Sequence, residues 1–309
     1  MMKNTTKQFE IIKNDFKFKN KKNDLIKLNF LNNVSASPVW LSKKTGLVFH
    51  NEPRSSVEIA KEWSEKIFSN KMDTKKHHYT DNIPEMRARH YYVLDYMNSY
   101  LKLKKKKIFD FAFGQGGLLK IASENFKCRK ISGVEFSKTN HTQVNRLFNK
   151  KKNKIIYKKL FNSSIEDLNL SETEKPEISF LTWTLCNCID PIEVVKSLKN
   201  NIKKNGYLVV AESSRILVPF KKTIQNYFIS AKKIGHTHPW HWSLNSLLNI
   251  FKIFGFEPKK INRFYDVNDL VIIFQNKDNF NQKIVFDDYK KVLAFLKRWK
   301  TESKNFKFE

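Results

Sequence analysis

The chain has 309 residues, 40% of them hydrophobic and 26 of them phenylalanine, so it can fill the core of one large domain or two modest ones. No stretch approaches the roughly 18 to 20 consecutive apolar residues of a membrane span, and the first residues lack the apolar segment of a secretory signal. The three cysteines form no disulfide framework, which predicts a reduced, cytoplasmic protein.

The formal net charge of +28 raises the question of a nucleic-acid partner. Only 8 of the 58 basic residues are arginine, and the lysines are spread over the whole chain among many Asn, Ile and Phe residues. Proteins that read nucleic acid rely on arginine for bidentate contacts. We therefore interpret the charge mainly as a solvated lysine surface of compositional origin and keep nucleic acid as an alternative partner.

Residues 1–102 are expected to form an N-terminal accessory region. Residues 1–30 are basic and rich in Asn, with weak periodicity, so we expect little fixed structure at their start. Residues 34–50 contain Pro, Trp and Gly beside an apolar run and indicate a small β-rich piece.

Two helices are expected in the rest of this region. The first begins at Ser55 and carries an apolar face, and a polar loop with Tyr79 follows it. The second runs from Pro84, a favourable first-turn residue, to about residue 100. It includes Arg87 and Arg89, which could hold a carboxylate or a phosphate.

From residue 103 to 278 strands and helices alternate. The expected strands cover 107–113, 130–135, 154–160, 177–183, 206–212, 256–264 and 269–275, and the expected helices cover 117–125, 138–150, 191–203 and 243–254. This alternation predicts an α/β fold with a mostly parallel sheet covered on both faces. The last two strands are joined by a short turn, so they must pair antiparallel. A basic tail with an amphipathic helix is expected over residues 279–309.

Three glycines follow the first of these strands: Gly114, Gly116 and Gly117. A buried strand, a glycine turn and a helix N-terminus together suit a nucleotide-like ligand. Glycine permits positive φ and lets the backbone approach the ligand closely. A nicotinamide dinucleotide turn would have the pattern G-x-G-x-x-G, but Leu119 stands at the third glycine position.

The next strand ends at Glu135, about 20 residues past the glycines, where a carboxylate can accept hydrogen bonds from ribose hydroxyls. The segment 110–116 (DFAFGQG), followed by 133–135 (GVE), resembles the first two motifs of class I S-adenosylmethionine-dependent methyltransferases. Residues 181–191 (LTWTLCNCIDP) are similar to the segment that reads L-E-H-hydrophobic-x-D-P in many of these enzymes. The resemblance covers about 105–275. It implies a Rossmann-like sheet of seven strands in the order 3-2-1-4-5-7-6, with S-adenosylmethionine as the cofactor of a methyltransferase.

The resemblance also implies how the cofactor would be held. The turn after the first strand would contact the methionine half, side chains after the second and third strands would hold ribose and adenine, and the end of the fourth strand would lie near the methyl group. In chain order, the implied residues are Asp110, Ala112, Phe113, Gly114, Gln115 and Gly116 at the turn, Glu135 for the ribose, Phe136, Ser164 and Ile165 for the adenine, and Trp183 near the methyl group.

Residues 236–244 (HTHPWHWSL) resemble the H-E-H-L-x-Y-F-S-L segment of sugar C-methyltransferases, in which a histidine and a nearby tyrosine assist removal of a proton from the substrate carbon. This implies a small-molecule acceptor, such as a nucleotide-linked sugar or another glycan precursor. His238 is the first candidate for the base, and His236, His241 and Tyr79 are weaker candidates.

Three departures separate the chain from these motifs. Ala112 replaces the first glycine, Thr237 replaces the Glu of H-E-H, and residues 186–187 (CN) replace Glu-His. The first change adds one methyl group, whereas the other two can indicate a different substrate or a different methylated atom. Residues 37–49 are similar to the small zinc-binding module that precedes the sugar enzymes, but its cysteines are absent, so no metal is expected.

Two alternative functions stay open. The positive charge suggests an RNA or other nucleic-acid methyltransferase, although the N-P-P-Y or D-P-P-Y tetrapeptide of base amino-methyltransferases is replaced by residues 184–187 (TLCN). The motif departures suggest a non-catalytic partner protein that keeps the methyltransferase fold.

Overall fold

The computed structural model describes residues 2–17, 19, 21–32, 35, 37–50, 84–150, 157–213, 216–218, 222–228, 238–262, 269–278 and 283–303. The helix expected from Ser55, and the candidate bases Tyr79 and His236, lie outside the described residues.

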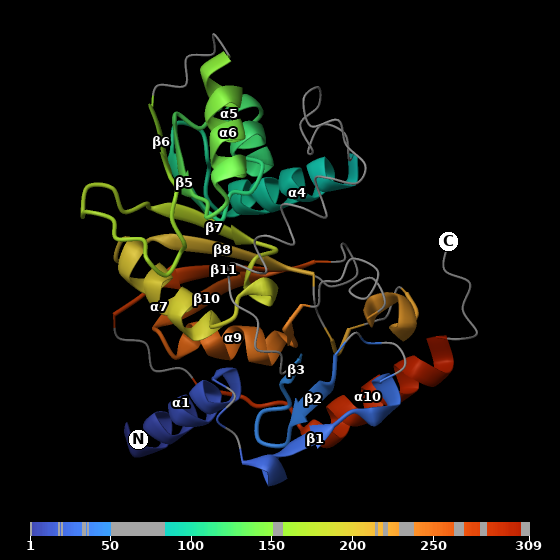
Figure 1. Ribbon diagram of the computed structural model, residues 1–309. Helices are drawn as coiled ribbons and strands as arrows, with labels where there is room; N and C mark the ends of the chain where they lie inside the picture. The colour runs from blue at the N-terminus through green and yellow to red at the C-terminus, as the bar shows by residue number, and fades with distance from the viewer. Residues whose placement is uncertain are drawn as a thin grey trace.

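A seven-stranded sheet crosses the centre of the molecule (Figure 1). Its strands are β4 (Lys107–Phe111), β5 (Lys130–Val134), β6 (Tyr157–Phe161), β7 (Ile178–Thr182), β8 (Tyr207–Glu212), β10 (Phe256–Ile261) and β11 (Leu270–Asn276). They lie in the order β6-β5-β4-β7-β8-β11-β10, and among the described strands of this sheet β11 alone runs opposite to the other six. Counted along the domain, this is 3-2-1-4-5-7-6, so the predicted Rossmann-like fold is confirmed.

Helices cover both faces of this sheet (Figure 1). One face packs against α4 (Pro84–Tyr100), α5 (Gly117–Glu124) and α6 (Lys138–Lys150), and the other against α1 (Met2–Phe16), α7 (Pro191–Asn201) and α9 (Leu244–Lys252). Successive strand residues enter opposite cores, as Ile108 and Phe109 do, because side chains alternate across a pleated strand. The strands β4, β7, β8 and β11 therefore appear in the sequence as largely apolar runs.

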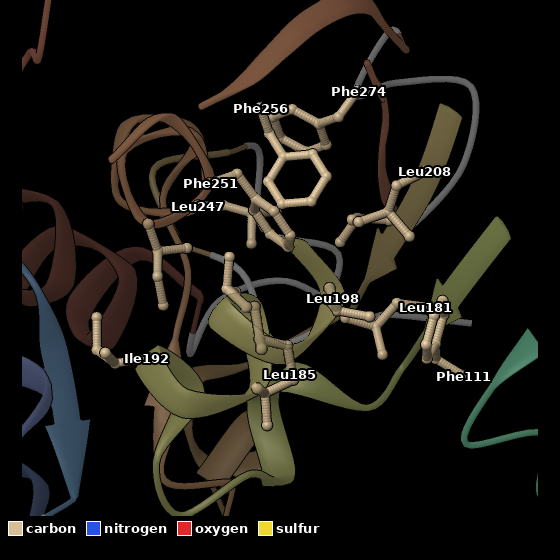
Figure 2. Close-up of a cluster of buried hydrophobic side chains, with 14 of the residues drawn as sticks. Phe111, Leu181, Leu185, Ile192, Leu198, Leu208, Leu247, Phe251, Phe256 and Phe274 are labelled. Atoms are coloured by element: carbon tan, nitrogen blue, oxygen red, sulfur yellow. The ribbon is translucent and has the colours of Figure 1, made fainter. Parts of the chain in front are cut away.

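Figure 2 shows the core between the sheet and helices α7 and α9. Phe251 of α9 stacks on Phe274 of β11 at a ring-centroid distance of 4.6 Å. Phe256 meets both rings edge-on, at 5.7 and 6.4 Å. Such aromatic pairs contribute about 0.5–1.5 kcal/mol beyond the burial of their area. The packing fixes the edge strands against the parallel strands that carry the site.

The N-terminus differs from the expectation of little fixed structure, because it forms helix α1. Ile12 and Phe16, one helical turn apart, enter the core beside α7. Phe16 packs against Trp240 and Trp242 at ring-centroid distances of 5.0 and 5.6 Å. Contacts from a distant segment thus stabilise a helix whose own periodicity is too weak to predict it.

A second, antiparallel sheet has the order β1-β2-β3-β9 and lies beside helix α10 (Figure 1). Its elements are β1 (Leu25–Lys27), β2 (Val39–Ser42), β3 (Val48–His50) and β9 (Trp240–His241), with 3-10 turns η1 (Lys22–Asp24) and η2 (Asn29–Leu31) around β1 and α10 (Tyr289–Glu302) packed on the sheet. The β-rich piece predicted at 34–50 supplies two of these strands. The fourth strand comes from the histidine segment, so this sheet joins the N-terminal region to residues 240–241.

Among the described helices, none combines the length and the apolar character that crossing a membrane requires.

Candidate functional site

The turn after β4, residues 112–116, is called the glycine turn here. Ala112, Gly114 and Gly116 have φ values of 62°, 52° and 73°. A Cβ at Gly116 would lie 2.9 Å from Val144, so a larger residue would clash with α6. At Gly114, no atom of the described residues lies within 4 Å of the position that a Cβ would take. The turn therefore has open space beside its backbone, as close approach of a ligand requires.

Glu135 follows β5 directly and is only 9% exposed. Its Oε2 accepts a hydrogen bond from the Gly114 amide and its Oε1 accepts one from the Ser137 amide, both over 2.8 Å. Burial raises the pKa of its carboxyl, although these two donors oppose the rise. Each carboxylate oxygen has a second lone pair, so Glu135 can hold the turn and still accept ribose hydroxyls.

Asp110 lies in β4 beneath the glycine turn and is 2% exposed. Its Oδ1 has no hydrogen-bond partner among the described residues. Burial, and then the nearby Glu135, raise the pKa of the Asp110 carboxyl well above its usual range. An unpaired buried polar atom costs about 1–3 kcal/mol, so this oxygen is suited to a cationic or hydrogen-bonding ligand.

The other two predicted residues of the turn contribute differently. Phe113 is 4% exposed and its ring packs in the core, close enough to Gly133 that a Cβ there would lie 2.8 Å from the ring. The Phe113 backbone amide donates a hydrogen bond to the Val134 carbonyl over 3.1 Å, which ties the turn to β5. Gln115 is half-buried within the turn.

Phe136 is one of the few large apolar side chains of the described residues that are exposed, at 45%. The Asn162 amide donates to the carbonyls of Glu135 and Phe136 over 2.9 and 3.0 Å, which fixes the backbone here. An exposed ring beside a buried carboxylate suits the stacking of a base next to its ribose.

Ser164 and Ile165 lie in the loop after β6. The Ser164 hydroxyl donates to Asp167 Oδ2 over 2.7 Å and accepts from the Asp167 amide. Ile165 is 6% exposed, and its side chain packs in the same hydrophobic cluster as helices α7 and α9. Any contact of Ile165 with an adenine would therefore use its backbone.

Trp183 follows β7 with a φ of 52°, and its amide donates to the Ala211 carbonyl over 2.7 Å. The Arg89 guanidinium lies 4.3 Å from its ring centroid and the His90 ring lies 5.1 Å away. Arg89 also makes two hydrogen bonds to the Asp269 carboxylate, of 2.9 and 2.8 Å. Arg89 thus binds a carboxylate of its own chain and packs against the Trp183 ring.

His238 lies beside the same strand end. Its Nδ1 is 2.6 Å from Asn187 Oδ1 in the 3-10 turn η3 (Leu185–Asn187), and the Asn187 amide donates to the Trp183 carbonyl over 3.1 Å. The structure therefore brings His238 and Trp183 together, although they are far apart in the sequence.

His241 has a different environment, in β9 of the second sheet. It is 4% exposed, with Nε2 2.9 Å from His50 Nε2 and Nδ1 2.8 Å from the Tyr227 hydroxyl. Burial, and then the neighbouring His50 and His238, lower the pKa of His241 well below its usual range. Both of its ring nitrogens face hydrogen-bond partners within this sheet's core, so the arrangement favours a structural part for His241.

Glu212, at the end of β8, was not among the predicted site residues. It is fully buried, and its Oε1 accepts a hydrogen bond from the Leu185 amide over 2.8 Å. Burial raises the pKa of its carboxyl to about 7, and its Oε2 has no partner among the described residues. A single acidic residue at the end of an apolar strand is the pattern that identified Glu135, and it could have identified Glu212 too.

A family model described as a methyltransferase domain matches residues 86–260. Among solved structures, the chain is similar to a methyltransferase solved in complex with the Haloferax volcanii Trm112 methyltransferase activator, at a TM-score of 0.50 and 10% identity over 63% of this chain and 93% of that one. It is also similar to an S-adenosylmethionine-dependent methyltransferase from Mesorhizobium loti, at a TM-score of 0.47 and 13% identity over 63% of this chain and 99% of that one. A protein assigned as a sarcosine dimethylglycine methyltransferase from Galdieria sulphuraria has a TM-score of 0.48 and 11% identity over 62% of this chain and 85% of that one. No curated protein matches the chain.

The residues around the glycine turn fit S-adenosylmethionine: open space at Gly114, an unpaired buried oxygen on Asp110 for a positively charged ligand, and Glu135 placed for ribose hydroxyls. The match of the family model over more than half of the chain shows that the chain belongs to the methyltransferase-domain family, and the features of the turn fit S-adenosylmethionine as its cofactor.

Proposed function

We propose that the chain transfers a methyl group from S-adenosylmethionine to a small-molecule acceptor and that His238 is the base. The observation that carries this proposal is the hydrogen bond between His238 and Asn187, which holds the imidazole at the end of β7. Strand β7 pairs with β4, so this strand end lies next to the glycine turn. An acceptor bound there would lie between the turn and His238.

When bound, S-adenosylmethionine supplies a methyl group carried on a positively charged sulfur. The chain has to align the acceptor with this group and remove a proton, which is the work of positioning and general-base catalysis. A neutral imidazole such as His238 can accept that proton near physiological pH. Burial raises the pKa of the Asp110 and Glu135 carboxyls beside the turn, and a cationic ligand bound there would favour their ionised forms.

The proposed acceptor is a nucleotide-linked sugar or another glycan precursor, which the protein would bind in the cytoplasm. The support is the similarity of residues 236–244 to the segment of sugar C-methyltransferases, together with the position of His238 at the site. Trp183, whose ring is contacted by both Arg89 and His90 of helix α4, would offer the acceptor a rigid aromatic wall.

The test is transfer of a labelled methyl group to a panel of nucleotide-linked sugars. We expect label in a sugar, loss of that transfer in His238→Ala, and nearly unchanged binding of S-adenosylhomocysteine by the same variant. Unchanged transfer in His238→Ala would remove the assignment of the base. A folded protein that labels no member of the panel would remove the acceptor class.

The net charge of +28 favours a second candidate, methyl transfer to RNA. Labelled transfer to total tRNA in the same assay separates the two. Binding of tRNA that disappears between low and physiological salt would indicate only loose attraction of lysines to phosphates.

A further inference from the structure

The neighbours of Asn187 determine which atom donates and which accepts in its hydrogen bond with His238. The Trp183 carbonyl lies 3.1 Å from Asn187 Nδ2, and a carbonyl oxygen can only accept hydrogen bonds. The NH2 group of Asn187 must therefore face Trp183. Its Oδ1 consequently faces His238 Nδ1, 2.6 Å away.

This orientation fixes where the imidazole of His238 carries its hydrogen. Asn187 Oδ1 has no hydrogen to offer, so Nδ1 of His238 must be the donor. A neutral imidazole is protonated at one nitrogen only, and the other then holds the lone pair. In neutral His238 that nitrogen is Nε2.

The segments that carry the two residues are also held together elsewhere. The Trp240 indole donates to the Cys188 carbonyl over 2.6 Å, two residues from His238 and one from Asn187. On the other side, Glu212 Oε1 accepts from the Leu185 amide at the start of η3. The 3-10 turn is therefore fixed to β8 and β9 at once, and Asn187 has little freedom to turn away.

From these contacts we infer that Asn187 is a positioning residue that holds His238 in the Nδ1–H tautomer, so that Nε2 is the atom that takes the proton from the acceptor. The inference rests on the proposed role of His238 as the base. Position 187 carries the His of the L-E-H segment in the enzymes that this chain resembles, and here an amide takes that place. An amide next to imidazole does not change charge with pH, so it sets a tautomer without titrating itself.

Nitrogen-15 NMR of the histidine rings tests this in the full chain saturated with S-adenosylhomocysteine. His238 is assigned by the signal that disappears in His238→Gln. In the wild type we expect a protonated Nδ1 and an unprotonated Nε2 above the pKa of His238. The opposite tautomer in the wild type would overturn the inference, and this measurement needs no substitution in the site.

Two variants sharpen the test. Asn187→Asp places a carboxylate on Nδ1–H and should raise the pKa of His238 by about one to two pH units. Asn187→Leu removes the acceptor and should let both neutral tautomers appear. The matched control is Asn226→Asp, which makes the same charge change at an exposed position and should leave His238 unchanged. An unshifted pKa in a folded Asn187→Asp protein would contradict the inference.

Methyl transfer separates this inference from the proposed function. With an acceptor in hand, Asn187→Asp should move the acidic limb of the pH–rate profile in the same direction as the pKa of His238. If His238→Ala keeps full transfer while the NMR results hold, the base assignment fails and the positioning contact stands. If His238→Ala is inactive but neither tautomer nor pKa responds at position 187, the positioning role fails alone.

Discussion

The Gly114 amide donates a hydrogen bond to Glu135 Oε2 over 2.8 Å, so the turn after β4 and the end of β5 form one unit. The carboxylate that we propose for the ribose is therefore hydrogen-bonded to the backbone that we propose for the methionine half. Substitutions at Glu135 should therefore affect both parts of the cofactor site together.

Glu135→Gln should lower the affinity for S-adenosylhomocysteine at least about tenfold, which corresponds to about 1.4 kcal/mol. Both side-chain oxygens accept backbone N–H groups, and an NH2 group in place of either would leave a buried donor unpaired. Calorimetric titration measures the affinity. Glu302→Gln, at an exposed pair with Arg298, is the control and should bind as the wild type does. Equal affinities in all three proteins would remove Glu135 from the site.

Phe136→Ala should weaken the same ligand while leaving stability nearly unchanged. Its ring is 45% exposed, so folding loses little when it is removed. Stacking of a base on an aromatic ring contributes about 1–3 kcal/mol, which predicts a loss of roughly fivefold or more in affinity. Phe16→Ala serves as a contrast, because this ring is buried, at 4% exposure. Its removal should lower the free energy of unfolding by about 3–5 kcal/mol. A loss of stability without a loss of affinity in Phe136→Ala would contradict the assignment.

Ala112→Gly should raise the free energy of unfolding by up to about 1 kcal/mol. Ala112 has a φ of 62°, a region that costs a residue with a Cβ about 1–2 kcal/mol and costs glycine almost nothing. The greater entropy of glycine in the unfolded chain offsets about 0.5–1 kcal/mol of this gain. Urea unfolding measures the difference. Ala122→Gly, inside helix α5, should destabilise the protein instead, and the same sign in both variants would exclude the backbone explanation.

Glu212→Gln should make stability less dependent on pH. Burial raises the pKa of Glu212 in the folded protein to about 7, from about 4.3 in an unfolded chain. The protonated group therefore supports the fold fully below about pH 4.3, and this support is lost as the pH rises through about 7. Gln keeps the oxygen that accepts a hydrogen bond from the Leu185 amide. The free energy of unfolding of the variant should therefore exceed that of the wild type by up to about 3 kcal/mol at pH 8.

Urea unfolding of both proteins at pH 4 and pH 8 checks this. We expect similar stabilities at pH 4 and a clear advantage of Glu212→Gln at pH 8. Parallel pH profiles for the two proteins would show that Glu212 is not the group that titrates.

The central sheet could be predicted from the sequence because four of its strands are largely apolar and helices of ordinary length alternate with most of the strands. Helix α1 and strand β9 could not, since α1 depends on Phe16 meeting Trp240 and Trp242, far along the chain. Local patterns carry no information about such partners. Isolated short segments of this kind gain most of their stability from tertiary packing.

The proposed cofactor and acceptor parts of the site also differ in how far local sequence patterns predict them. The proposed cofactor half follows from contiguous motifs, so Glu135 and the glycine turn could be named as candidates in advance. The proposed acceptor half would be assembled from α4, η3, β8 and the segment around His238. Its contacts, such as that between Arg89 and Asp269, join residues that no local pattern relates. Ala112 shows the limit of reading a motif, because its methyl group is small but its backbone is left-handed.

Calorimetric titration of the full chain with S-adenosylhomocysteine at neutral pH tests the cofactor site most directly. The structure predicts saturable binding at one site per chain, which weakens in Glu135→Gln and persists in His238→Ala. Absence of binding by protein that circular dichroism shows to be folded would contradict it.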